Sequence, residues 1–234
     1  MNVTYQHRIN IAIDGPAGAG KSTVARLVAG KLQYVYVDTG AMYRAVTVVA
    51  LERGIPIEDD ARLGELAAAL DISLLPGDGG QIVLADGDDV TEVIRSREVT
   101  LSVSRVSACA AVRQRMSELQ RRMAAAKGIV MDGRDIGTHV LPDAELKIFL
   151  TASPAERARR RYLELGDDPG VTLEQLEREI SQRDRMDSER EIAPLRQAAD
   201  AVLIDSTGLT IEQIVGEIVS RADQASQTTA AREN

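Results

Sequence analysis

Cysteine and aromatic residues are scarce in this chain of 234 residues. It has one cysteine, no tryptophan and one phenylalanine, and aromatic residues make up only 3% of it. A single cysteine excludes an internal disulfide. Cys109 lies in the apolar stretch 106–112, so we interpret it as a small buried hydrophobic residue, and a reducing compartment fits best.

Long apolar runs are absent as well. The longest run near the N-terminus is residues 9–13, too short for a signal-peptide core, and no stretch approaches the ~20 apolar residues of a membrane span. The formal net charge is −8, and no long basic block is present, which argues against nucleic acid as a partner. We expect a cytoplasmic monomer with neither a membrane nor a nucleic acid as partner.

Asparagine occurs only at positions 2, 10 and 234. The Asn-Lys-x-Asp motif that binds guanine in GTPase switches therefore cannot be present, nor can the metal-binding asparagine of a protein-kinase catalytic loop. Lysine is scarce too, with four residues, so arginine supplies most of the 28 basic side chains.

Short β-branched runs alternate with longer helical stretches, a pattern typical of parallel βαβ units. Five core strands are predicted, at residues 9–13, 34–37, 129–131, 146–150 and 201–204. The fold class is therefore α/β, a doubly wound five-stranded parallel sheet with helices on both faces. Residues 71–75, a Pro-Gly-Asp-Gly-Gly turn and residues 81–86 predict a small antiparallel hairpin inserted near 71–90.

The stretch 154–199 is helical and heavily charged, and residues 166–170 split it into two helices. It is either a mobile lid or an ordinary solvated helical pair. The last dozen residues, 223–234, lack a periodic apolar face and are predicted to be a flexible tail.

A phosphate-binding loop follows the first strand. Residues 15–22 read Gly-Pro-Ala-Gly-Ala-Gly-Lys-Ser, which matches Gly-x4-Gly-Lys-Ser/Thr and leads into a helix predicted over 23–32. In such a loop, consecutive backbone N–H groups point at phosphate oxygens. Lys21 would contact the terminal phosphates, and the Ser22 hydroxyl would bind Mg²⁺. The pattern predicts a P-loop NTPase.

Polar residues also follow the second and third strands, where ligands bind in open α/β sheets. Asp38 or Thr39 can cap the next helix, and Arg44 lies one turn further on. Asp132 directly follows an apolar strand and suits an Mg²⁺ contact, directly or through water. A phosphate acceptor is already an anion at pH 7 and needs positive side chains rather than a base.

Arginines late in the chain fall at helical spacing. Arg183, Asp187 and Arg190 share one face of a predicted helix, which could bind a phosphorylated ligand. Arg157, Arg160 and Arg161 share another face, which taken alone indicates surface charge.

Four motifs together resemble the bacterial cytidylate kinases: GPAGAGKST at 15–23, DTGAMYR at 38–44, DGRDIGT at 132–138 and RDRMDSER at 183–190 followed by Ala-Pro-Leu. The resemblance covers residues 9–221 and implies a nucleoside monophosphate kinase. The implied organisation has a P-loop core at 1–38, 128–154 and 192–222, a monophosphate-binding lobe at 39–127 carrying the β insert, and a short helical lid with flanking helices at 155–191.

The resemblance also implies roles for individual residues. ATP would be bound by Gly15, Pro16, Ala17, Gly18, Ala19, Gly20, Lys21, Ser22 and Thr23. CMP or dCMP would be bound by Asp38, Thr39, Tyr43, Arg44, Ser104, Arg113, Arg134, Asp135, Arg183, Asp187 and Arg190. Among these, Ser104, Arg113 and Asp135 would bind the cytosine, and Arg134 and Arg183 the acceptor phosphate. Lys21, Arg157, Arg160 and Arg161 would stabilise the transferred group, with Mg²⁺ held by Ser22 and Asp132.

The expected reaction is ATP + CMP ⇌ ADP + CDP. Two alternatives stay open: a kinase for another small acceptor, either UMP or a hydroxyl compound with Asp38 as base, and a non-catalytic nucleotide-dependent switch.

Overall fold

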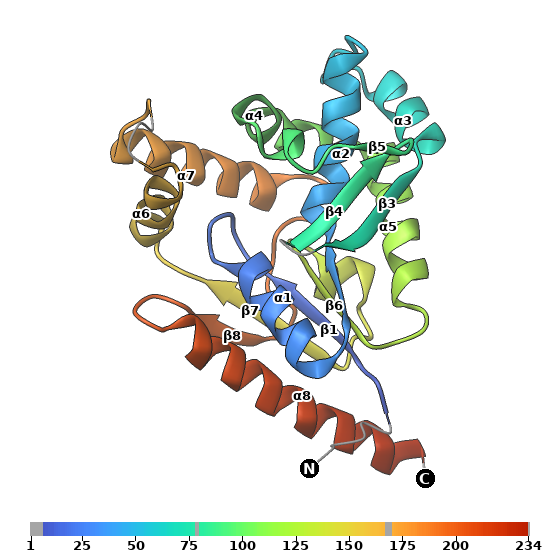
Figure 1. Cartoon of the computed structure of the whole chain (residues 1–234), viewed down its shortest axis with the longest axis vertical. Helices are drawn as coiled ribbons and strands as arrows, with labels where there is room; N and C mark the ends of the chain where they lie inside the picture. The colour runs from blue at the N-terminus through green and yellow to red at the C-terminus, as the bar shows by residue number, and fades with distance from the viewer. Residues whose placement is uncertain (1–6, 78–79, 167–169, 234) are drawn as a thin grey trace. The chain divides into compact units, whose positions relative to one another are not determined.

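The computed structural model describes residues 7–77, 80–166 and 170–233. The chain divides into two compact units (Figure 1). The first contains residues up to 36, residues 126–189 and residues from 193 onward, and the second contains residues 37–125 and 190–192. Within the described ranges, no helix is both long enough and apolar enough to cross a membrane.

A five-stranded sheet organises the first unit. Its strands are β1 (Asn10–Asp14), β2 (Val35–Asp38), β6 (Ile129–Gly133), β7 (Leu146–Thr151) and β8 (Val202–Asp205), in the order β2-β6-β1-β7-β8. Strand β1 runs parallel to β6 and β7, and β7 runs parallel to β8. The five predicted strands are confirmed to within two residues at each end, and β2 is where the chain passes into the second unit.

Helices α1 (Lys21–Leu32) and α8 (Ile211–Glu233) pack against this sheet and each other, as Figure 1 shows. Val24 and Val28 of α1 and Ile214 and Ile218 of α8 are buried in one apolar cluster with the sheet. The i, i+4 spacing of each pair places both side chains on the same face of the helix, the one that is buried.

The predicted flexible tail is wrong, because α8 continues through Glu233. Ala222 is 3% exposed, and the Ser226 hydroxyl donates a hydrogen bond of 2.7 Å to the carbonyl of His7. These contacts join the two ends of the chain, so the local sequence pattern does not reveal them.

Helices α6 (Pro154–Glu164) and α7 (Leu173–Glu189) pack as a pair. Ser153 caps α6 by accepting the N–H of Glu156 at 3.2 Å, and proline at the next position suits the first turn. Residues 167–169 of the predicted break lie outside the described residues.

The expectation that helix extends to residue 199 and that Arg190 shares a face with Arg183 is wrong, because α7 ends at Glu189. Ala193 has a left-handed φ of 48° and is followed by a proline, a combination that a helix does not accommodate. The N–H of Leu195 then turns back to the carbonyl of Asp187 at 2.8 Å.

The second unit is built from α2 (Thr39–Glu52), α3 (Asp60–Ala69), α4 (Arg97–Val106), α5 (Ala110–Ala124) and the short helix η1 (Val93–Arg95). Its apolar core includes Met42, Leu63, Met116 and Cys109, and the 1% exposure of Cys109 confirms its interpretation as a buried hydrophobic residue. Helices α4 and α5 are separate, because the backbone of Cys109 between them is extended.

A three-stranded antiparallel sheet of β3 (Ile72–Gly77), β4 (Gly80–Ala85) and β5 (Asp88–Asp89) belongs to this unit (Figure 1). The predicted hairpin is confirmed, with Ile72 opposite Ala85, although positions 78 and 79 of its turn lie outside the described residues. Strand β5 was not predicted. It follows a tight turn in which Asp86 and Gly87 both have positive φ, 51° and 91°, as two-residue hairpin turns require.

Candidate active site

The P-loop runs from the end of β1 to the start of α1, as predicted. A Cβ at Gly15 would lie 1.9 Å from the carbonyl oxygen of Leu150, so no side chain fits there. Gly20, with φ of 87°, precedes the first residue of α1 in a left-handed conformation. These glycines let the backbone fold tightly, the conformation in which its N–H groups can surround a phosphate.

Lys21, the first residue of α1, is buried and donates a 2.7 Å hydrogen bond to the carbonyl of Pro16. Burial, together with the nearby guanidinium groups of Arg134 and Arg183, lowers the pKa of its ammonium from 10.5 to about 7, against the opposing effects of Asp132 and Asp14. The end of the P-loop therefore has an excess of positive charge that a bound polyphosphate would neutralise.

Asp132 of β6 lies beside the P-loop. Its two carboxylate oxygens accept hydrogen bonds from the hydroxyls of Ser22, at 2.9 Å, and Tyr36, at 3.0 Å. The structure thus brings together the two residues predicted to serve Mg²⁺. A hydroxyl and a carboxylate supply the oxygen ligands that Mg²⁺ prefers, so this pair fits the ion.

Arg134, Arg183 and Asp187 come together in the first unit. The Nε of Arg134 lies 3.0 Å from a carboxylate oxygen of Asp187, which is 4% exposed. Burial and the adjacent charge of Arg134 together lower the pKa of the Arg183 guanidinium to about 10. Two arginines and one lysine thus share a region with the carboxylates of Asp132 and Asp187.

The loop that carries Arg134 is fixed by Asp14, the last residue of β1. Asp14 accepts hydrogen bonds from the backbone N–H groups of Ile136 and Gly137, the first residues of the short helix η2 (Ile136–Val140). Burial raises the pKa of the Asp14 carboxyl from 3.8 to about 6, although both hydrogen bonds act in the opposite direction.

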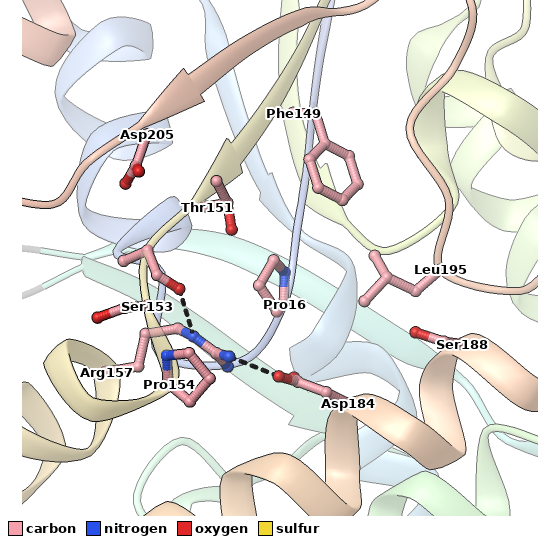
Figure 2. Close-up of a pocket in the computed structure, with 11 residues that line it drawn as sticks. Pro16, Phe149, Thr151, Ser153, Pro154, Arg157, Asp184, Ser188, Leu195 and Asp205 are labelled. Atoms are coloured by element: carbon pink, nitrogen blue, oxygen red, sulfur yellow. Dashed lines mark hydrogen bonds and ion pairs between the residues drawn. The ribbon is translucent and has the colours of Figure 1, made fainter.

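The three arginines of α6 occupy different environments. Arg157 is 3% exposed; its guanidinium donates to the carbonyls of Ala152 and Ala17, both at 2.9 Å, and lies 2.6 Å from Asp184 (Figure 2). Surface charge is therefore the wrong interpretation for Arg157, because the carbonyl of Ala17 belongs to the P-loop itself.

Arg160 also contacts the P-loop, through the carbonyl of Ala19 at 3.5 Å. It donates to the hydroxyl and the carbonyl of Ser206 at 3.0 and 2.9 Å. Arg161 instead pairs with Glu164 at 3.0 Å and is 41% exposed, so surface charge does describe it.

A pocket of about 480 Å³ lies beside Arg157 in the first unit (Figure 2). Pro16, Phe149 and Leu195 give it an apolar part. Its polar part comes from Thr151, Ser153, Ser188, Asp184 and Asp205. The guanidinium of Arg157 points from its edge toward Asp184, as the dashed line in Figure 2 shows.

In the second unit, Asp38 caps α2 by accepting the N–H of Ala41 at 2.9 Å, as predicted, and Thr39 is buried at 3% exposure. Arg44 donates to the carbonyl of Ile94 and to the hydroxyl of Thr100, both at 2.9 Å. Its position is therefore set by η1 and α4, two elements far away in sequence.

Tyr43, Ser104 and Arg113 form a second group in this unit. The Arg113 guanidinium lies 5.6 Å from the centre of the Tyr43 ring and donates to the carbonyl of Ser107 at 3.2 Å. The Ser107 hydroxyl in turn donates to the carbonyl of Ser104 at 3.0 Å. Arg113 is 2% exposed, which is rare for an arginine without a structural or binding role.

Several residues that contact the predicted site were missed by the sequence reasoning: Asp14, Tyr36, Asp184 and Ser206. Asp14 and Tyr36 lie on strands whose carboxyl ends lead to the site, which is a usable signal. Asp184 gives none, because an acidic residue on a charged helix is usually solvated.

A family model described as cytidylate kinase matches residues 11–224. This chain belongs to the cytidylate kinase family. Relatives named cytidylate kinase include one from Limosilactobacillus fermentum, 57% identical over 92% of this chain and 96% of that protein. Another, from Geobacillus kaustophilus, is 56% identical with the same coverage of each. The motifs of this cytidylate kinase family member extend over nearly the whole matched range.

Among solved structures, a gluconokinase from Sinorhizobium meliloti aligns with a TM-score of 0.51 at 15% identity, covering 97% of this chain and 99% of that one. At this identity the likeness concerns the fold alone. It agrees with the α/β fold of the cytidylate kinase family member described above.

Proposed function

We propose that this chain transfers the γ-phosphoryl group of ATP to CMP, and to dCMP as a second acceptor, in the reaction ATP + CMP ⇌ ADP + CDP. Membership of the cytidylate kinase family makes it a phosphotransferase. The observation that supports the proposal best is the group of Lys21, Arg134 and Arg183 at the P-loop, where burial and mutual repulsion lower the pKa of Lys21 to about 7.

The P-loop and Lys21 are proposed to bind the ATP phosphates. Transfer proceeds in line between two oxygens, so catalysis consists of positioning the reactants and neutralising charge. Arg160, with its guanidinium at Ser206, is proposed to stabilise the oxygens of the transferred group. Each arginine of α6 already pairs with a carboxylate in this conformation: Arg157 with Asp184, Arg160 with Glu156 and Arg161 with Glu164. Direct contact with the transferred group therefore requires any of the three to exchange partners.

In the first unit, Arg134 and Arg183 are proposed to bind the acceptor phosphate, and Asp187 to orient Arg134 and approach the ribose. In the second unit, Thr39, Tyr43, Arg44 and Arg190 are proposed to contribute to monophosphate binding. Because the acceptor is a phosphate anion at pH 7, no general base is required.

Cytosine recognition is assigned to Ser104, Arg113 and Asp135. A buried guanidinium and hydroxyl can donate hydrogen bonds, and a buried carboxylate can accept from an exocyclic amine. Base recognition is proposed to rest on these hydrogen bonds rather than on ring stacking, because aromatic residues make up only 3% of the chain.

Ser22 and Asp132 are proposed to hold Mg²⁺, Asp132 directly or through water. When bound, the ion neutralises charge on the ATP phosphates. The Ser22 hydroxyl donates a hydrogen bond of 2.9 Å to the Asp132 carboxylate, so both oxygens lie close enough to bind one ion.

The test is a coupled assay of ADP release with ATP, Mg²⁺ and a panel of ribo- and deoxyribonucleoside monophosphates. We expect kcat/KM to be higher with CMP and dCMP than with the other monophosphates of the panel. A higher kcat/KM with UMP, or turnover only with an alcohol acceptor, would replace the assignment. ATP binding without transfer to any monophosphate would indicate a nucleotide-dependent switch.

A further inference from the structure

Asp14 is the last residue of β1 and immediately precedes the P-loop. It is 4% exposed, and its two carboxylate oxygens accept the N–H groups of Ile136 at 2.8 Å and Gly137 at 2.7 Å. These donors lie more than a hundred positions further along the chain. Binding of phosphate by the P-loop does not require this carboxylate.

The two N–H groups that Asp14 binds begin η2, where a helix has no carbonyls of its own to satisfy them. The residues just before them are Arg134 and Asp135, the proposed ligands of the acceptor phosphate and of cytosine. The carboxylate of Asp14 therefore fixes the backbone at the point from which both side chains project.

Gly137 shows how closely the loop approaches this carboxylate. A Cβ at position 137 would lie 3.3 Å from one oxygen of Asp14 and 3.2 Å from the Cδ of Lys147. The backbone N–H reaches its short hydrogen bond because no side chain separates the loop from β1.

We propose that Asp14 is a positioning residue for the acceptor side of the reaction, holding residues 134–137 so that Arg134 and Asp135 meet the monophosphate in the correct place. This inference rests on the proposed function. Both oxygens of Asp14 are taken by backbone N–H groups, and a phosphate acceptor needs no base, so proton transfer is not its role. Asp14 also adjoins Gly15, so one residue ties the donor loop to the acceptor loop.

The first test is Asp14→Asn. The amide keeps one accepting oxygen but turns an NH2 group toward a backbone N–H, so one of the two hydrogen bonds is lost. We expect kcat/KM for CMP to fall roughly 10- to 100-fold while KM for ATP changes by less than about two-fold. Amide hydrogen exchange at Ile136 and Gly137 should accelerate about ten-fold or more in the ligand-free protein.

Two further variants separate positioning from stability. Ile218→Ala removes a fully buried side chain of α8 within the same unit and serves as the control for destabilisation. It should lower the Tm without changing the ratio of the two KM values. Gly137→Ala disturbs the same hydrogen bond from the loop side and should shift kinetics in the direction of Asp14→Asn, which keeps the test valid if Asp14→Asn fails to fold.

Equal effects on the CMP and ATP parameters, as in Ile218→Ala, would overturn the positioning role, as would unchanged amide exchange at Ile136 and Gly137. Failure of the proposed function itself would be seen in the wild-type protein. If it transfers phosphate to no monophosphate, the proposed function fails, and amide exchange then decides alone whether Asp14 holds the loop.

Discussion

The folded protein disfavours the charged form of Lys21. Its pKa is lowered from 10.5 to about 7, first by burial and then by the charges of Arg134 and Arg183. Between these two values the unfolded chain binds a proton that the folded protein has released. Stability therefore rises as the pH increases from about 7 to 10.5, and below pH 7 the buried charge acts against folding at full strength.

Replacing Lys21 by methionine removes the buried charge. We expect the ligand-free Lys21→Met variant to have a higher Tm than the wild type at pH 6, and the gain to shrink at pH 9, because the wild-type lysine is then already neutral in the folded state. Phosphoryl transfer should fall by on the order of 10²- to 10³-fold in kcat. Thermal unfolding at the two pH values checks the first point. A lower Tm at pH 6 than the wild type would contradict it.

Binding of a triphosphate should restore the charge of Lys21. Because the phosphates stabilise the ammonium form, we expect net proton uptake when ATP binds at pH 8. Calorimetric titrations in two buffers of different ionisation enthalpy measure this uptake directly. The uptake should disappear in Lys21→Met, and equal uptake in both proteins would show that another group takes the proton.

At the scale of elements, the spacing on α7 predicted that Arg183 and Asp187 share a face. In the structure the charge of Arg183 lowers the pKa of Lys21, and Asp187 pairs with Arg134. The same reasoning could not predict that Arg157 would be buried. Its partners are two backbone carbonyls and a carboxylate on another helix, and none of these has a sequence signature. Arg157 instead joins the P-loop, α6 and α7 through a single guanidinium.

Asp184→Asn should therefore destabilise the protein far more than an exposed pair on the same helix would. Removing one partner of a buried pair costs roughly 3 kcal/mol in the free energy of unfolding, and the partial exposure of Asp184 places it at or below that figure. Glu189→Gln, which breaks the exposed pair with Arg185, is the matched control and should cost less than about 1 kcal/mol. Denaturant unfolding measures both. Similar costs for the two variants would mean that Arg157 does not depend on Asp184.

At the scale of the whole molecule, the core strands were predictable because β-branched runs alternating with helices specify a parallel sheet largely through local pattern. The hairpin was predictable from its turn residues. The end of α8 was not, since its support comes from the contact of Ser226 with His7 at the opposite end of the chain. The partners of Asp14 and Arg44 could not be predicted either, because they also lie far away in the sequence.

Truncation after residue 221 tests whether the end of α8 supports the fold. It removes Ala222 and Ser226, both at least nine-tenths buried, so we expect the Tm to fall by several degrees, on the order of 1 to 2 kcal/mol in stability. Truncation after residue 231, which keeps both side chains, is the control. If the two truncated proteins unfold at the same temperature, the helical end is dispensable.

If this chain transfers phosphate from ATP to CMP, the transferred phosphate itself can be followed. The protein is incubated with ATP labelled at the γ-phosphate, Mg²⁺ and CMP, and the products are separated and identified. We predict that the label appears in the β-phosphate of CDP, with little inorganic phosphate, and that Lys21→Met slows its transfer by on the order of 10²- to 10³-fold. Label found only in inorganic phosphate, or retained in ATP, would contradict the claim.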